Sequence, residues 1–187
     1  MSRQPTRNAA AYDFYLLGRR AVTIGTPLGG RRAAEMLDSA AFYAQKALDV
    51  DPNFSDALAL LANSHFVGAM RGYRTPLGVV VDSAAALARR AIALDSASGE
   101  AWQVLAGSAL YLEDDFPKAK ALLEAGVRSA PTHPAIRNFQ AIYLGEVEGR
   151  IDSAIAVARR ATELDMATIF LNTLGDQYMR NRQYDSA

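Results

Sequence analysis

The chain has no cysteine and only two histidines among its 187 residues. The lack of cysteine excludes disulfide bonds and thiolate chemistry, but it leaves the compartment open, because such domains occur in both the cytoplasm and the periplasm. No histidine lies at helical spacing from another, so a zinc site would need mostly carboxylate ligands. We expect neither a metal nor a cofactor.

Long hydrophobic runs are also missing. No stretch approaches the 18 or more consecutive apolar residues of a membrane-spanning helix, and residues 1–14 lack the apolar segment of a signal peptide. We therefore expect a soluble segment that makes no membrane contact.

The net charge is zero, and its distribution is only mildly uneven. Residues 1–91 carry 11 Lys and Arg against 7 Asp and Glu, and residues 92–187 carry 9 against 13. A nucleic-acid-binding domain usually has a concentrated basic face with stacking aromatic side chains, and this chain has no such segment. We expect no binding of nucleic acid.

Catalytic and ligand-binding motifs are absent from the sequence as well. It contains no G-x-S-x-G, H-E-x-x-H, G-x-G-x-x-G or phosphate loop. Asp49-x-Asp51-x-Asn53 begins like a calcium loop, but Phe54 and Leu60 occupy the positions of the required glycine and glutamate. The sequence predicts no catalytic residue, no metal ligand and no enzyme.

What the chain has in quantity is alanine at a repeated spacing. One phrase of mostly small residues, with steps of four and then three positions and closing on an acidic turn, occurs four times, with a weaker third copy: Ala40-x3-Ala44-x2-Ala47-x4-Pro52, Ala84-x3-Ala88-x2-Ala91-x4-Ser96, Ala119-x3-Leu123-x2-Gly126-x4-Pro131 and Ala154-x3-Ala158-x2-Ala161-x4-Met166. A second helical phrase is paired with it: Phe14-x2-Leu17-Gly18-x2-Ala21, Leu58-x2-Leu61-Ala62-x2-His65, Trp102-x2-Leu105-Ala106-x2-Ala109 and Leu171-x2-Leu174-Gly175-x2-Tyr178.

This pairing resembles the tetratricopeptide repeat (TPR), a helix pair of about 34 residues with the pattern W-x2-L-G-x2-Y…A-x3-F…P. The resemblance implies an all-α, right-handed α-solenoid of antiparallel helix pairs, with about four and a half repeats. Its small residues allow close approach of the two helices, as we expect at Gly18, Ala62, Ala106 and Gly175. We expect residues 1–10 to be a disordered or linker segment, and residues 11–187 to form one solenoid domain truncated within the fifth repeat.

The first two repeats contain extra residues between their helices. The step from Gly18 to Ala40 is 22 residues, whereas the step from Ala106 to Ala119 is 13, and each longer step contains Thr-Pro-Leu-Gly, at 26–29 and 75–78. One interpretation is a binding lip that carries Arg31, Arg32, Arg71, Tyr73 and Arg74. The other is that these residues lengthen the helices and cover the apolar end of the solenoid.

Several polar residues have a structural interpretation. We expect His65 to pack or hydrogen-bond between helices, His133 to lie in a turn, and the acidic run 113–115 to complement the positive end of the helix that follows. In the fourth repeat Arg137, Gln140 and Ala141 depart from the pattern, so Ile136 or Phe139 should supply its packing.

The first helix of each TPR lines a concave groove, and the predicted function is to bind a protein or peptide there. Helical spacing nominates Tyr12, Tyr15, Arg19, Asp56, Asn63, Glu100, Gln103, Tyr111, Asn138 and Asn172. The alternative for any one of them is ordinary solvated helix surface. Only Arg19 and Asn63 match the side chains with which chaperone-docking relatives grip a terminal carboxylate, so we expect no such clamp.

The phrase Ala11-Tyr12-x2-Tyr15-Leu16-x-Gly18-Arg19, followed by expanded and then compact repeats, resembles the TPR region of bacterial regulators that carry a serine/threonine kinase, an adenylate cyclase or a winged-helix domain. This resemblance implies a sensory or docking segment, cytoplasmic or periplasmic if the regulator is membrane-bound. A free-standing scaffold or secretion or stress accessory protein, and an accessory domain controlling an attached enzyme, remain alternatives.

Overall fold

The computed structural model describes residues 6–25, 30–73, 77–166 and 168–181. Within these residues all regular secondary structure is helical, with no strand. The helices are α1 (Ala9–Gly25), α2 (Gly30–Val50), α3 (Ser55–Met70), α4 (Leu77–Leu94), α5 (Gly99–Tyr111), α6 (Phe116–Ser129), α7 (Pro134–Glu146), α8 (Ile151–Leu164) and α9 (Thr168–Arg180).

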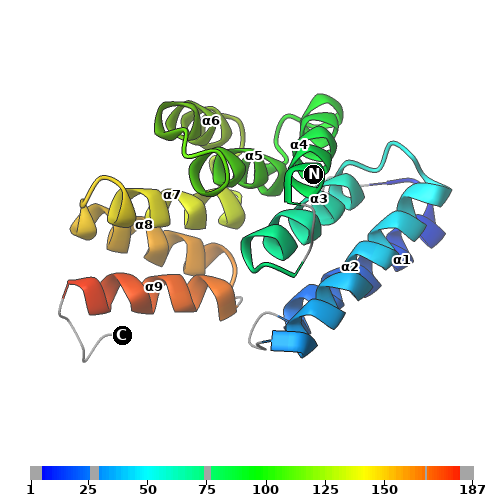
Figure 1. Ribbon diagram of the computed structural model, residues 1–187, viewed down its shortest axis with the longest axis horizontal. Helices are drawn as coiled ribbons and strands as arrows, with labels where there is room; N and C mark the ends of the chain where they lie inside the picture. Colours follow the sequence, from blue (N-terminus) through cyan, green and yellow to red (C-terminus); the bar gives the residue numbers. More distant parts are fainter. Residues whose placement is uncertain (1–5, 26–29, 74–76, 167, 182–187) are drawn as a thin grey trace.

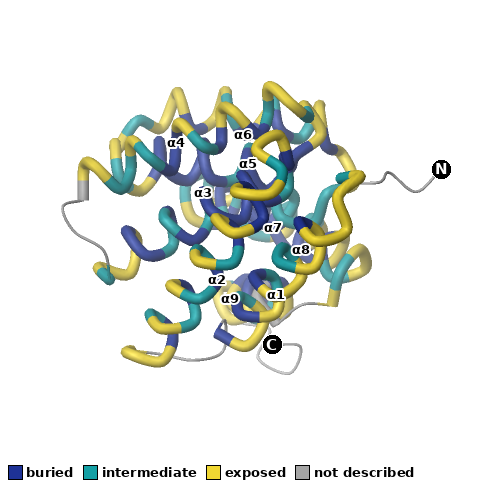
Figure 2. Tube along the Cα trace, turned by 90° about the vertical axis from the view of Figure 1, so that its right-hand side faces the viewer, coloured by how far each residue is buried: buried dark blue, intermediate teal, exposed yellow. Residues whose placement is uncertain are grey.

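The helices form an all-α solenoid of stacked pairs. Each of the pairs α1–α2, α3–α4, α5–α6 and α7–α8 packs together, and each first helix also contacts the next, from α1 to α3, α5, α7 and α9. The stack bends into an arc in which α9 faces the α1–α2 pair across the open side (Figure 1). Helices α3 and α5 lie inside and are largely buried, whereas α4 and α6 expose one side (Figure 2).

The repeated alanines explain how closely the paired helices approach. Ala40, Ala44 and Ala47 of α2 are fully buried, and so are the corresponding alanines of α4 and α8, Ala84, Ala88, Ala91, Ala154, Ala158 and Ala161. A Cβ atom added to Gly18 of α1 would lie only 3.2 Å from the backbone oxygen of Ala40 in α2, and 2.8 Å from Leu60 Cδ2 of α3. The predicted small contact residues Gly18, Ala62 and Ala106 are therefore buried, whereas Gly175 is half-buried.

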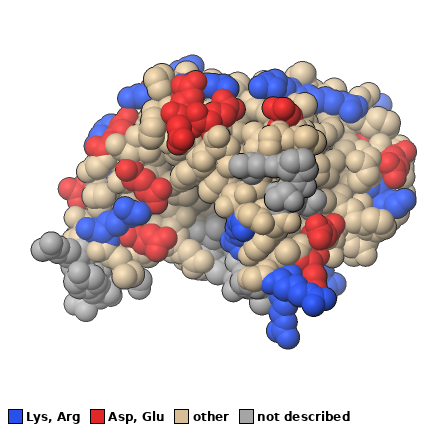
Figure 3. Space-filling model, viewed as in Figure 1, with Lys and Arg blue, Asp and Glu red and all other residues tan. Residues whose placement is uncertain are grey.

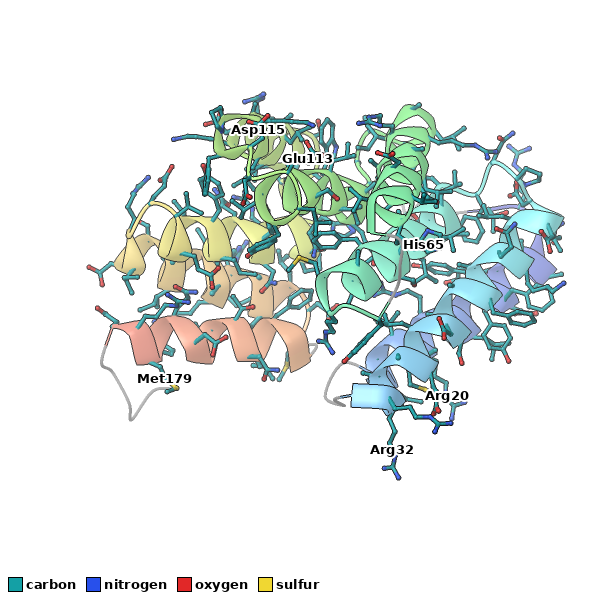
Figure 4. All side chains as sticks on the ribbon, in the orientation of Figure 1. Arg20, Arg32, His65, Glu113, Asp115 and Met179 are labelled. Carbon is teal, nitrogen blue, oxygen red and sulfur yellow. The ribbon has the colours of Figure 1, made fainter. Side chains whose placement is uncertain are left out.

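The extra residues of the first two repeats lengthen their helices. Helices α1 to α4 have 16 to 21 residues, and α5 to α9 have 13 or 14. Residues 26–29 and 74–76 lie outside the described residues, so the structure does not test a lip formed by these segments. Arg31 and Arg32 belong to the first turn of α2, and Arg32 points away from the body of the molecule (Figure 4).

The polar residues with a predicted structural role have one. His65 Nδ1 lies 3.2 Å from Ser83 Oγ and so links α3 to α4 (Figure 4). Asp115 caps α6 by accepting a hydrogen bond from the Lys118 backbone N–H at 3.0 Å. His133 precedes α7, where its Nδ1 accepts from the Ala135 N–H.

The fourth repeat packs as predicted, because Ile136 is fully buried and Phe139 is only 2% exposed. Among the described residues, none of the helices has both the length and the apolar character needed to span a bilayer.

Candidate functional site

A cavity of about 200 Å³ lies on the concave side of the arc. It joins parts of the chain far apart in sequence: the end of α1, the start of α2, the inner faces of α3 and α5, the start of α7, and the α8–α9 region. The surface is hollowed between the α9 side and the α1–α2 side of the molecule (Figure 3). The polar and charged lining residues are Arg19, Thr23, Asn63, Arg71, Glu100, Gln103, His133, Asn138 and Asp165.

The first helices of three successive repeats meet in one polar cluster at this cavity. Arg19 of α1 lies against Glu100 of α5, with its Nη1 3.3 Å from Oε2 and 3.4 Å from Oε1. Asn63 of α3 donates from Nδ2 to Glu100 Oε1 at 3.1 Å. Glu100 is only 9% exposed, so it is a buried carboxylate with a guanidinium and an amide as partners.

Charge and burial shift two pKa values beside the cluster. The Glu100 carboxylate raises the pKa of Arg19, and more weakly Asp165 and Asp56 act in the same direction, against the opposing effect of burial. Burial raises the pKa of Tyr15, so its hydroxyl keeps its proton near neutral pH. Arg19 is therefore a cation in contact with Glu100, and the charges of Asp165 and Asp56 also act on it.

Two amide oxygens at the cavity lack a hydrogen-bond partner among the described residues. They are Oδ1 of Asn63, whose Nδ2 is engaged by Glu100, and Oδ1 of Asn138, a residue only 4% exposed. An unsatisfied buried acceptor costs about 1–3 kcal/mol. Both residues line the cavity, so the cost falls at a place where a ligand or water is able to relieve it.

Aliphatic and aromatic side chains form the rest of the wall. On one side these are Ala21, Val22, Ala33, Met36, Leu37 and Val67, and on the other Pro134, Ala135 and Phe170. Most of the first group belong to the interval between Gly18 and Ala40 that exceeds its counterpart in the third repeat by nine residues. The extra turns of α1 and α2 thus form one wall of the cavity.

Half of the ten nominated groove residues line the cavity: Arg19, Asn63, Glu100, Gln103 and Asn138. The other five do not. Asp56 is half-buried and acts on Arg19 through its charge, and Tyr12 and Tyr15 stack with ring centroids 6.0 Å apart. Tyr111 donates to Glu146 Oε2 at 3.3 Å, and Asn172 lies exposed on α9.

The nomination missed Asp165, Phe170, His133 and the walls from α1 and α2. It took only one face of each first helix. His133 and Asp165 lie in turns, Met36 and Leu37 lie in a second helix, and Val22 and Phe170 lie at other positions of first helices. The available signal was the excess length between Gly18 and Ala40, which carries Val22, Met36 and Leu37.

No group of three or more His, Cys, Asp or Glu side chains in the described part of the chain is arranged to hold a metal ion. The polar cluster contains one buried carboxylate whose oxygens already face Arg19 and Asn63. Its chemistry is that of hydrogen bonding and charge pairing.

Comparison with solved structures identifies the architecture. A thermophilic TPR protein from Thermus thermophilus, TTC0263, superposes with a TM-score of 0.62 at 19% identity, over 90% of this chain and 85% of that chain. The chain has the TPR fold. The MamA protein matches with a TM-score of 0.47 at 17% identity, over 94% of this chain and 85% of that one. No protein-family model and no curated protein matches the sequence.

Proposed function

We propose that this TPR-fold chain is a non-catalytic protein-interaction module that binds an extended peptide segment of a partner in its concave cavity. The observation that carries the proposal is the convergence of Arg19, Asn63, Glu100 and Asn138, from four different helices, on one solvent-connected cavity with apolar walls. Polar groups that fix orientation beside apolar surface are typical of a ligand site.

The same contacts argue against a clamp for a terminal carboxylate. Arg19 is paired with Glu100, and Asn63 is oriented by the same carboxylate. A ligand carboxylate at this place would compete with Glu100 for its partners and would be repelled by Glu100 itself.

Selection from a random 12-residue peptide display library tests peptide binding directly. We expect enriched peptides to bind the wild type and to slow amide hydrogen exchange in α3, α5 and α7. Replacing two of the three cavity amides, Gln103→Ala with Asn138→Ala, should weaken binding at least about tenfold, or about 1.4 kcal/mol.

Gln45→Ala with Asn53→Ala is the matched control, because both side chains are exposed and neither lines the cavity. Equal affinity of the two double variants would move the site elsewhere, and the absence of any enriched peptide would overturn peptide binding.

We further propose that this module is the sensory or docking part of a larger bacterial regulatory protein. The support is the resemblance of its opening phrase, Ala11 to Arg19, and of its expanded first repeats to such regions. A kinase, adenylate cyclase or winged-helix domain encoded in the same reading frame would agree with this proposal. Repeats alone would favour a free-standing scaffold.

A further inference from the structure

Among the described residues, the buried cavity atoms that lack a hydrogen-bond partner are acceptors. Because Asn63 directs Nδ2 to Glu100, its Oδ1 is the atom left over, and it has no partner within the described parts of the chain. Asn138, 96% buried and on the next helix but one from Glu100, lines the same cavity with its own unpartnered Oδ1. Carbonyl oxygens accept hydrogen bonds and cannot donate them, so only a group with N–H or O–H donors satisfies them.

Charged side chains of both signs surround these acceptors. Glu100 and Asp165 line the cavity, and Asp56 is close enough to act on the same arginine. Arg19 contacts Glu100, and Arg71, the other arginine of the lining, is exposed at the end of α3. Glu100 is the buried carboxylate among them, so a cation that reaches it interacts at low local dielectric.

An anionic ligand gains less from this site. Arg19 already points at Glu100, and its side chain is 42% exposed, so water satisfies its remaining N–H groups. Asn138 Oδ1 is buried and has no hydrogen-bond partner among the described residues, so it gains more from a donor than Arg19 gains from a further acceptor.

The apolar walls define the shape of the missing group. Val22, Leu37, Val67 and Phe170 surround the polar cluster with aliphatic and aromatic surface. A side chain with a hydrocarbon stem and a cationic tip fits both features, because long basic side chains bury their methylenes while the charged end seeks acceptors.

We propose that the cavity binds a basic side chain of the partner peptide, lysine or arginine, with its cationic nitrogen among Glu100, Asn63 Oδ1 and Asn138 Oδ1. The inference rests on the proposed peptide binding and adds the class of residue recognised. Lysine supplies three N–H donors and arginine five, enough for these acceptors together.

The test uses peptides enriched from the random library, resynthesised with each basic residue replaced by norleucine, which keeps an aliphatic stem and removes the charge. We expect one basic position to be shared, and its replacement to raise the Kd at least about tenfold on the wild type. The basic peptide should bind the Glu100→Gln variant more weakly than the wild type. The norleucine replacement should then raise the Kd clearly less on Glu100→Gln than on the wild type. Glu163→Gln, an exposed position on α8, should leave both Kd values unchanged.

Enriched peptides without a shared basic residue would overturn the inference while leaving peptide binding intact. An equal increase in Kd on the wild type and on Glu100→Gln would also overturn the inference alone. A library that yields no binder overturns both proposals. If Glu100→Gln lowers the melting temperature too far, Asn138→Leu removes one acceptor at similar volume and must also reduce the cost of norleucine.

Discussion

The first two repeats and the next two have one fold but are stabilised differently. In α1 to α4 the helices are long, and a single buried cluster extends from Ala11 to Leu105. In α5 to α8 the helices are short, and side-chain caps and ion pairs between elements supplement a smaller cluster. Polar contacts at helix ends occur in both halves, since Asn8 Oδ1 also accepts from the Ala11 N–H at the start of α1. The difference indicates that the long repeats depend more on apolar burial than the compact repeats do.

The same difference produces the cavity. The compact third repeat has no extra residues between its helices. Its helix α5 forms the floor of the cavity with Glu100 and Gln103. The long first repeat extends α1 and α2 beyond the helix contact at Gly18, and those turns supply Val22, Met36 and Leu37. The extra turns of the first repeat thus form a wall of the cavity whose floor belongs to the third repeat.

Phe54→Ala should have the largest effect and is aimed at the long half. Phe54 is fully buried before α3, with its ring centroid 5.2 Å from that of Tyr15. Removing it should lower the free energy of unfolding by about 3–5 kcal/mol, measured by chemical denaturation. Because each repeat contacts only its neighbours, hydrogen exchange should increase mostly in α1 to α4.

Phe116→Ala is the matched control, since Phe116 is 48% exposed and its loss should cost less than about 1 kcal/mol. Equal destabilisation by the two substitutions, or equal loss of protection in both halves, would refute the assignment of the long half to apolar burial.

Asp115→Ala examines the caps of the compact half. Loss of the hydrogen bond to the Lys118 N–H should cost about 1 kcal/mol in thermal or chemical unfolding. Asp114→Gly removes the same charge one residue earlier, but Asp114 has a φ of 53°, a conformation that glycine adopts without strain. We expect Asp114→Gly to be neutral or slightly stabilising, and a similar loss for both variants would show that charge, not capping, matters in this turn.

The sequence predicted what depends on local spacing. The alanine phrases located the helix pairs, the length excess located the long helices, and Asp115 and His65 have their predicted local roles. Half of the nominated groove residues reach the cavity because helical spacing places them on the inner face.

The remainder of the site depends on curvature. The bend of a solenoid accumulates from small rotations between repeats, and no single segment encodes it. It brings Asp165 and Phe170 into the wall formed by the first repeat, and Arg19 into contact with Glu100, 81 residues later. Spacing marked Glu100 as groove surface, but its burial follows from this contact between repeats.

The smallest expected effect concerns the ion pair that joins α6 to the turn after α7. Lys120 Nζ lies 2.8 Å from Glu148 Oε1, and this hydrogen bond holds the pKa of Glu148 below its usual value. A carboxylate whose pKa is lowered by folding contributes stability above its unfolded pKa and loses it as the pH falls through the folded value. Glu148→Gln should therefore lower the melting temperature slightly at pH 7, and the difference from the wild type should shrink toward pH 3.

Salt gives an independent measurement of the same pair, because both side chains are partly exposed, at 52% for Lys120 and 20% for Glu148. The effect of Glu148→Gln should diminish in 1 M NaCl, where the Debye length is about 3 Å. Glu163→Gln, which removes a pair within α8, is the control and should change the melting temperature less, since it joins no separate elements. If Glu148→Gln still lowers the melting temperature at low pH and high salt, Glu148 stabilises the fold by packing and not by its charge. The compact half would then depend on burial, as the long half does.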